Sequence, residues 1–319
     1  MRFVDAEAIG RLLAYPDLVD ILAARFSEGA HAPPRHHHTV RLEGRPDATL
    51  LLMPAWTADP GNAAVAGRYL GIKSVTVFPD NNTRGKPAIY GAYLLLSTET
   101  GEPLALMDAP ALTVWRTAAA SALAARFLAR EDAARLVMIG AGALAPYIIR
   151  AHASVRPIRE VAIWNRSRAN AERVVAALAG AGFAVGVADD LETAVRGADI
   201  VSTATISATP ILQGAWLRPG THVDCVGAFR PDMRETDDDV VHRARIWVDT
   251  RAGGLAEAGD ILIPLRAGVI RETDIQGDLF ELCRGTAPVR RDATEITMFK
   301  SVGASIEDLA AAVAVYERL

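Results

Sequence analysis

The chain has 319 residues, of which half are apolar and 23% are charged, and its formal net charge is −4. This composition is typical of a globular protein, and the length exceeds what one core usually supports, so two domains are expected. The small net charge gives no electrostatic basis for binding nucleic acid or an anionic membrane. No basic and apolar leader or membrane-length apolar run is present, so we expect a cytoplasmic protein that binds small molecules.

The first third of the chain predicts an α+β arrangement. Apolar spacing over residues 5–28 predicts amphipathic helices, with Pro16 starting the second one. Short apolar runs between about 40 and 106, separated by Gly, Pro, Asn and Asp, predict an antiparallel sheet. The Ala-rich segment LTVWRTAAASALAARFLA, residues 112–129, lacks Gly and Pro and predicts a long helix that bridges two domains.

Beyond this bridge, strands and helices alternate regularly. Strands are predicted at RLVMIG, EVAIWN, FAVGVA, DIVSTAT and THVDCVGA, with helices from about 143 and at NAERVVAALAG and LETAVRGA. This alternation predicts a Rossmann-type, doubly wound parallel α/β sheet. MFKSVGA is expected to be poor in strand, and the final helix, 305–319, to return to the first domain. The expected division is 1–115 with 304–319 for the first domain, and 116–303 for the second.

A glycine motif follows the first strand of the α/β region. In IGAGALA, Gly140, Gly142 and Ala145 form GxGxxA at the start of a predicted helix. The first glycine permits a tight turn, the second permits close approach of a pyrophosphate, and the small third residue permits close packing of helix on strand. The motif alone is weak, but its position between strand and helix predicts a dinucleotide site at the helix N-terminus.

The segment Asn165-Arg166-Ser167-Arg168 ends the next strand, where an NAD-preferring site typically places Asp or Glu for the ribose hydroxyls. The tetrad has no acid, and an arginine there can pair with a 2′-phosphate. NADP(H) is therefore the preferred cofactor, with NAD(H) as the alternative. The arginines could instead form a solvated cluster at a helix start.

Three cations in the first domain are candidates for substrate binding. Lys73 interrupts the apolar run GIKSVTVF, and Arg116 lies among Ala, Val and Trp on the bridge helix, where a charge is costly unless paired or facing a cleft. Arg116 could equally extend to the surface or form an ion pair within the fold. Arg35 follows two prolines and is unremarkable by itself.

No metal site is expected. His36, His37 and His38 are consecutive, and neighbouring residues of an extended segment point to opposite faces, so they cannot share one ion. Cys225 and Cys283 are far apart in sequence and match no metal-ligand spacing, so both are expected to be thiols.

Together these residues resemble the ornithine cyclodeaminase and mu-crystallin family over essentially the whole chain. The matching segments are PPR at 33–35, LLMPAW at 51–56, GIK at 71–73, LTVWRTAA at 112–119, IGAGALA at 139–145, IWNRS at 163–167, GAFRPDMRE at 227–235 and FKSVG at 299–303. Several ordered motifs together are far more specific than any one of them.

The resemblance implies that 1–115 with 304–319 form a substrate-binding and dimerisation domain, and that 116–303 bind the dinucleotide. It also implies a dimer through the antiparallel sheets and an active site between the two domains. It implies that Arg35, Lys73 and Arg116 hold the substrate carboxylate and the region of the reacting nitrogen. Met53 and Phe229 are candidates for the substrate pocket. Besides the arginine tetrad, the implied cofactor neighbours are Thr117, Gly140, Ala141, Gly142, Ala143, Leu144, Thr203, Ala204, Thr205, Gly227, Ser301 and Val302.

This chain departs from the family pattern at one position that distinguishes the activities of the family members. Cyclodeaminases and archaeal-type alanine dehydrogenases of the family have a catalytic Asp two residues after the glycine that corresponds to Gly227, where this chain has Phe229. The resemblance is therefore strongest to the ketimine reductase branch, which implies NADPH-dependent reduction of pyrroline-2-carboxylate or piperideine-2-carboxylate to L-proline or L-pipecolate. Alternatives are an ornithine cyclodeaminase, an amino-acid dehydrogenase, or a non-catalytic protein that binds NADP(H) and a small ligand.

Overall fold

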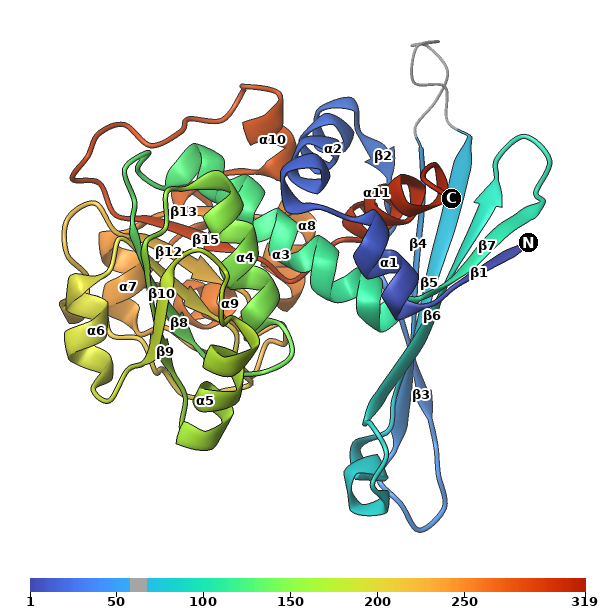
Figure 1. The fold of residues 1–319 in the computed structure, drawn as a ribbon, viewed down its shortest axis with the longest axis horizontal. Helices are drawn as coiled ribbons and strands as arrows, with labels where there is room; N and C mark the ends of the chain where they lie inside the picture. The colour runs from blue at the N-terminus through green and yellow to red at the C-terminus, as the bar shows by residue number, and fades with distance from the viewer. Residues whose placement is uncertain (58–67) are drawn as a thin grey trace. The chain divides into compact units, whose positions relative to one another are not determined.

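The computed structural model describes residues 1–57 and 68–319 and divides the chain into two compact units (Figure 1). Unit 1 contains Met1–Arg116 and Ala304–Leu319, and unit 2 contains Thr117–Gly303, which places the division one residue from the expected boundary. The predicted bridge is confirmed as helix α3, Ala109–Leu128, and the division falls within it. Within the described ranges, no helix is long and apolar enough to cross a membrane.

Unit 1 is built on a seven-stranded sheet with the order β1-β7-β6-β5-β4-β2, in which β3 also pairs with β4. All pairings are antiparallel except that of β1 with β7, so the predicted antiparallel sheet is confirmed. The strands are β1 (Arg2–Val4), β2 (Ala30–His31), β3 (His36–Val40), β4 (Ala48–Thr57), β5 (Tyr69–Val77), β6 (Ile89–Ser97) and β7 (Pro103–Asp108).

Besides the start of α3, the described part of unit 1 contains α1 (Ala6–Leu12), α2 (Tyr15–Glu28), α11 (Ser305–Tyr316) and the 3₁₀ helix η2 (Pro79–Arg84). Pro16 lies in the first turn of α2, as predicted, where its missing N–H costs nothing. Helix α11 contacts α2 and strands β4, β5 and β6, and Figure 1 shows it against this sheet. Ten of the twelve residues of α11 are apolar or small, and the helix is buried on nearly every side.

Unit 2 has an eight-stranded sheet with the order β10-β9-β8-β11-β12-β15-β13-β14, and every pairing is parallel. Chain order reverses between β8 and β11, which is where doubly wound sheets bind ligands at the carboxyl ends of their strands. The strands are β8 (Arg135–Ile139), β9 (Glu160–Trp164), β10 (Ala184–Val187), β11 (Ile200–Thr203), β12 (His222–Cys225), β13 (Arg245–Val248), β14 (Ile275–Asp278) and β15 (Thr297–Lys300).

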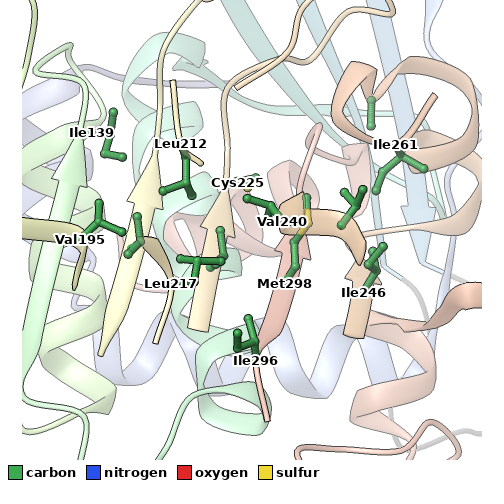
Figure 2. Close-up of a cluster of buried hydrophobic side chains, with 14 of the residues drawn as sticks. Ile139, Val195, Leu212, Leu217, Cys225, Val240, Ile246, Ile261, Ile296 and Met298 are labelled. Atoms are coloured by element: carbon green, nitrogen blue, oxygen red, sulfur yellow. The ribbon is translucent and has the colours of Figure 1, made fainter. Parts of the chain in front are cut away.

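The helices of unit 2 bury the faces of this sheet. They are α4 (Ala145–Val155), α5 (Arg168–Ala177), α6 (Leu191–Gly197), α7 (Asp238–Arg243), α8 (Arg251–Glu257), α9 (Gly259–Arg266) and α10 (Leu279–Cys283). One core cluster joins alternate strand residues, such as Ile139 and Met298, to Val195 of α6, Val240 of α7 and Ile261 of α9. Figure 2 shows these side chains gathered along the sheet.

The segment MFKSVGA, expected to be poor in strand, contains most of β15, so that expectation was wrong. Strand β15 lies inside the sheet, between β12 and β13, and all four of its residues are buried. A strand buried on both faces lacks the alternation that marks a half-exposed one. Lys300 adds a charge to it, and this charge is neutralised locally, as described below.

Candidate active site

The sheet of unit 1 aligns four buried side chains on the face that α11 covers. Met53, Lys73, Tyr93 and Met107 are direct cross-strand partners on β4, β5, β6 and β7, so they form one row. All four are buried. Gly71 precedes Lys73 on the same face, and a Cβ at this position would lie 1.8 Å from the Tyr93 hydroxyl, so the glycine makes room for the ring.

The predicted cations Lys73 and Arg116 are brought together by two acids of α11. Lys73 Nζ lies 2.7 Å from Asp308 Oδ2, and Arg116 Nε lies 3.0 Å from Asp308 Oδ1. Arg116 Nη1 also donates to Glu307 Oε2 at 2.6 Å. Both acid side chains are fully buried. Arg116 therefore does form ion pairs within the fold, which was one of its two alternative interpretations. It also shares the Asp308 carboxylate with Lys73.

Burial lowers the pKa of Lys73 to about 8, although the Asp308 carboxylate acts in the opposite direction. The guanidinium groups of Arg116 and Arg35 lower it further, which places Arg35 within electrostatic range of the same cluster. An ammonium with a pKa near neutral pH can give up and regain a proton during turnover. The cluster is therefore suited to general acid chemistry beside an anion-binding guanidinium.

Phe229, a predicted pocket residue, lies in unit 2 beyond the end of β12 and is 42% exposed. It follows Ala228, whose φ of 49° is in the left-handed region that non-glycine residues rarely adopt. The nearest acid in sequence, Asp232, is exposed and accepts from Arg230 Nε at 2.9 Å. Arg230 lowers the pKa of Asp232, so this carboxylate is ionised and already paired at the surface.

The glycine loop of unit 2 has the geometry of a dinucleotide site. Gly140 has φ of 108°, and a Cβ there would lie 2.7 Å from the Ala204 carbonyl oxygen, so the loops after β8 and β11 touch at this glycine. A Cβ on Gly142 would meet nothing within 4 Å, which leaves its backbone open to a ligand. Helix α4 begins at Ala145, directly after the loop. A pocket of about 390 Å³ lies beside it, lined by Ala141, Gly142, Ala143, Pro146, Asn170, Arg173, Val174 and Ala177.

The tetrad after β9 divides into a structural residue and exposed cations. Asn165 Oδ1 accepts from the N–H of Ala141 at 3.2 Å, so it ties the tetrad to the glycine loop. Arg168 is held by Glu172, at 2.9 Å, and by Asp189. Arg166 is exposed and has no hydrogen bond or ion pair with any residue that the structure describes. Of the two arginines, Arg166 is therefore the one available to an anionic ligand.

The predicted nicotinamide neighbours rest on a buried charged network. Glu235 accepts from Thr203 Oγ1 at 2.9 Å and from the backbone N–H of Thr205 at 2.7 Å. Lys300 donates to the carbonyl of Gly227 and lies 3.3 Å from Asp260 Oδ2. Burial raises the pKa of Glu235 to about 7. These contacts fix the loops after β11 and β12.

The loop after β15 is held in a similar way. Asp249 Oδ2 accepts from Ser301 Oγ at 3.1 Å and from the N–H groups of Val302 and Gly303 at 2.7 and 2.6 Å. Thr117 is buried in α3 at the first position of unit 2. Four of the predicted cofactor neighbours lie at or just after the carboxyl ends of adjacent strands in the sheet of unit 2, namely Gly140, Thr203, Gly227 and Ser301.

Sequence reasoning singled out neither Glu307 nor Asp308. The available signal was their position in SIEDLAAAVAVY, where two acids precede an otherwise apolar helix. Acids in a first turn normally complement the helix dipole at the surface, so this pattern has a common explanation that needs no site. A helix apolar all round is buried, however, and its acids then require cationic partners.

The parallel order of unit 2, its reversal between β8 and β11 and the open glycine loop there define a Rossmann-type nucleotide-binding fold. The sequence model described as "Ornithine cyclodeaminase/mu-crystallin family" matches residues 2–319. The chain belongs to this family, which confirms the resemblance.

Three proteins are similar to this chain over nearly its whole length. A Delta(1)-pyrroline-2-carboxylate reductase of Colwellia psychrerythraea is 34% identical, covering 100% of this chain and 99% of the relative. The Thermococcus litoralis Delta(1)-pyrroline-2-carboxylate reductase, solved with NADH and L-proline, is 32% identical with a TM-score of 0.90, covering 100% and 97%. An archaeal alanine dehydrogenase dimer with bound NAD is 30% identical with a TM-score of 0.88, covering 100% and 95%.

Proposed function

We propose that this protein is a cytoplasmic, NADPH-dependent reductase of cyclic ketimines such as pyrroline-2-carboxylate and piperideine-2-carboxylate. The observation that supports the proposal is the buried pair of Lys73 and Arg116, joined by Asp308, because an ammonium can donate a proton and a guanidinium can bind an anion. The names of the pyrroline-2-carboxylate reductases at 34% and 32% identity support the substrate class.

The buried cluster around Asp308 suits an anionic substrate. Lys73 and Arg116 both contact the Asp308 carboxylate, and the positive charge of Arg35 acts on Lys73 as well. A carboxylate binds favourably to such a cluster in a desolvated environment. We assign carboxylate binding to Arg116 and Arg35, and the imine nitrogen to Lys73.

Unit 2 fits a dinucleotide through the open backbone at Gly142, the pocket beside it and the start of α4. When bound, the reduced nicotinamide supplies a hydride to the carbon of the C=N bond. Lys73 supplies the proton to the nitrogen, and the arginines orient the ring by its carboxylate. Phe229 has no proton to exchange, which disfavours deamination of an aliphatic amino acid.

Arg166 is the basis for proposing NADPH rather than NADH. Its guanidinium is exposed and, among the described residues, has no partner, while the tetrad around it has no acid to accept from ribose hydroxyls. A 2′-phosphate would give it a charge-assisted pair. The NADH and NAD bound by the two structural relatives make NAD(H) the competing cofactor in any assay.

We also propose a homodimer formed by the sheets of unit 1. The face opposite α11 has an aligned apolar row of Pro54, Ile72, Leu94, Leu106 and Phe3, of which Phe3 is 75% exposed. An apolar face of this kind is typical of an oligomer interface. Light scattering with size-exclusion chromatography tests this, since Leu94→Lys with Ile72→Lys should convert a dimer into a monomer of 34.0 kDa.

The experiment for the function is a substrate panel followed at the NADPH absorbance. Pyrroline-2-carboxylate and piperideine-2-carboxylate should be reduced. Pyruvate with ammonia is included because one structural relative is an alanine dehydrogenase, and this pair tests that alternative. Faster turnover of pyruvate with ammonia than of either cyclic imine would reject the ketimine assignment. Binding of NADPH with no turnover of any of them would identify a non-catalytic binding protein.

A further inference from the structure

One carboxylate of unit 1 contacts both cations to which we assign the substrate. Asp308 Oδ2 lies 2.7 Å from Lys73 Nζ, and its other oxygen lies 3.0 Å from Arg116 Nε. The Asp308 side chain is fully buried, and so is nearly all of the Lys73 side chain. A two-oxygen bridge of this kind fixes both the distance and the orientation between the two cations.

The neighbouring acid does not share this geometry. Glu307 precedes Asp308 on α11 and is equally buried, and it forms an ion pair with Arg116. Two carboxylates of the same charge, one residue apart, therefore have different partners. This difference provides a matched pair of variants in which only one removes the contact to Lys73.

The groups around Asp308 come from four elements. Lys73 is on β5, Arg116 is on α3, Glu307 is on α11 itself, and Tyr93 is on β6. Burial and the Asp308 charge raise the pKa of the Tyr93 phenol well above its ordinary value, so this hydroxyl stays neutral. Arg116 and Lys73 hold the pKa of Asp308 below its ordinary value despite burial, so Asp308 remains an anion.

We propose that Asp308 is a positioning residue for the reduction, holding the Lys73 ammonium and the Arg116 guanidinium at the one separation that serves the imine nitrogen and the carboxylate of a single substrate. This inference rests on the proposed function and deepens it. Asp308 acts through the two cations and does not contact the reacting atoms.

The proposal has a consequence for the proton. In the reduction, the C=N carbon accepts a hydride from the reduced nicotinamide and the nitrogen accepts a proton from Lys73 Nζ. The products are an amine with new C–H and N–H bonds, an oxidised nicotinamide and a neutral Lys73. The Asp308 anion then favours the return of a proton from water to Lys73, because an opposite charge at this distance stabilises the ammonium.

Lysine NMR can measure this role apart from turnover, because the chain has only three lysines, at positions 73, 86 and 300. With ¹³C at the lysine Cε, each gives one signal, and Lys86→Arg and Lys73→Met assign them. In the unmodified protein the Lys73 signal should titrate with a pKa of about 8. In Asp308→Asn its midpoint should move to lower pH by about 1 to 3 pH units.

The kinetic readout is the alkaline limb of the pH profile of kcat/KM with pyrroline-2-carboxylate. Asp308→Asn should move this limb to lower pH together with the NMR midpoint. Glu307→Gln should raise KM through Arg116 and leave both the limb and the Lys73 midpoint in place. An unmoved limb in Asp308→Asn, or equal displacement in Glu307→Gln, would overturn the proposal.

Asp308→Glu keeps the charge and covers the case in which Asp308→Asn fails to fold. It should preserve the Lys73 midpoint while lowering kcat, since one added methylene displaces both cations, and an unchanged kcat would overturn the positioning role. Failure of the unmodified protein to reduce any ketimine would reject the proposed function. The NMR titration would still decide separately whether Asp308 governs Lys73.

Discussion

Each unit contains a buried charged cluster, and the two clusters are built differently. In unit 2, Asp260 Oδ1 accepts from the backbone N–H groups of Glu235 and Thr236, and Lys300 donates to a backbone carbonyl. In unit 1, the bridge from Lys73 through Asp308 to Arg116 joins side chains only. The first cluster therefore determines the shape of loops, whereas the second sets the positions of two cationic side chains relative to each other.

This difference indicates which buried charges serve structure and which serve chemistry. Charges bonded to backbone groups cannot reorganise without moving the loops that they hold. Charges paired through side chains orient one another instead, as Asp308 orients Lys73 and Arg116. We therefore expect substitutions in the cluster of unit 1 to affect kinetics as well as stability, and substitutions in the cluster of unit 2 to affect stability and cofactor binding.

The largest effect should come from Arg116→Ala. It should lower kcat/KM of the folded fraction by about 10²- to 10⁴-fold, because the carboxylate loses its binding and orienting group. It should also lower stability, by about 3 to 5 kcal/mol, because the buried acids Glu307 and Asp308 each lose an ion pair with its guanidinium. Arg130→Ala is the control, since it breaks ion pairs with Asp132 and Asp199 in unit 2. Normal kinetics in folded Arg116→Ala would contradict the assigned role.

Lys300→Met tests the cluster of unit 2. Removing the cation leaves Asp260 and Glu235 buried without it, so the free energy of unfolding should fall by about 3 to 5 kcal/mol. Chemical denaturation measures this loss, and the KM for the ketimine should change much less than the affinity for NADPH. A large rise in ketimine KM with unchanged NADPH affinity would contradict the distinction between the clusters.

A smaller effect is expected at Arg166, which belongs to neither cluster. Arg166→Ala should lose about 1.5 to 3 kcal/mol of NADPH binding and little NADH binding, because only NADPH has the 2′-phosphate. Arg168→Ala is the matched control, since Arg168 is already paired with Glu172 and Asp189. Calorimetric titration with both cofactors decides this, and equal affinities in the unmodified protein would rule it out.

The smallest effect is a pH-dependent one. The pKa of Glu235 rises on folding from an ordinary 4.5 to about 7, so the folded state binds more protons between these values and ionisation destabilises it as pH rises. Glu235→Gln should therefore gain stability relative to the unmodified protein, by about 1 to 3 kcal/mol, between pH 5 and 8.

The pKa of Glu295 is shifted in the opposite direction from that of Glu235, so its effect on stability should have the opposite pH dependence. Contacts with Arg291 and Arg245 hold its pKa below its ordinary value despite partial burial, so its contribution to stability is present at neutral pH and is lost on acidification. Glu295→Gln should cost stability at neutral pH, and this cost should shrink toward acid. Chemical denaturation at several pH values gives the change in unfolding free energy caused by each variant. The same pH dependence of this change in both variants would contradict the assignment for Glu235.

Local patterns predicted much of the fold. Alternation of strands and helices predicted β8 through β12, and GxGxxA placed the nucleotide loop, because these depend on neighbours in sequence. Strand β15 was missed since its four residues are buried on both faces and include Lys300. Its identity as a strand depends on β12 and β13, which are distant in sequence.

The candidate site was predicted in part for the same reason. Lys73 and Arg116 stood out as charges within apolar segments, but their acidic partners are distant in sequence. Glu307 and Asp308 lie 191 and 192 residues after Arg116, and Asp308 is still farther from Lys73. The apolar composition of the final helix indicates that it is buried, but it does not indicate which cations Glu307 and Asp308 contact. Only the packing of α11 against β5 brings these acids to the cations.

The most direct test of the central claim follows the hydride itself. The protein is incubated with pyrroline-2-carboxylate and NADPH deuterated at nicotinamide C4, beside a second reaction of L-ornithine with NAD(P)⁺. We predict deuterium at C2 of the L-proline product, one proline for each NADPH oxidised, and no ammonia from ornithine. Ammonia and proline from ornithine, with no deuterium transfer to the cyclic imine, would contradict the account and indicate a cyclodeaminase.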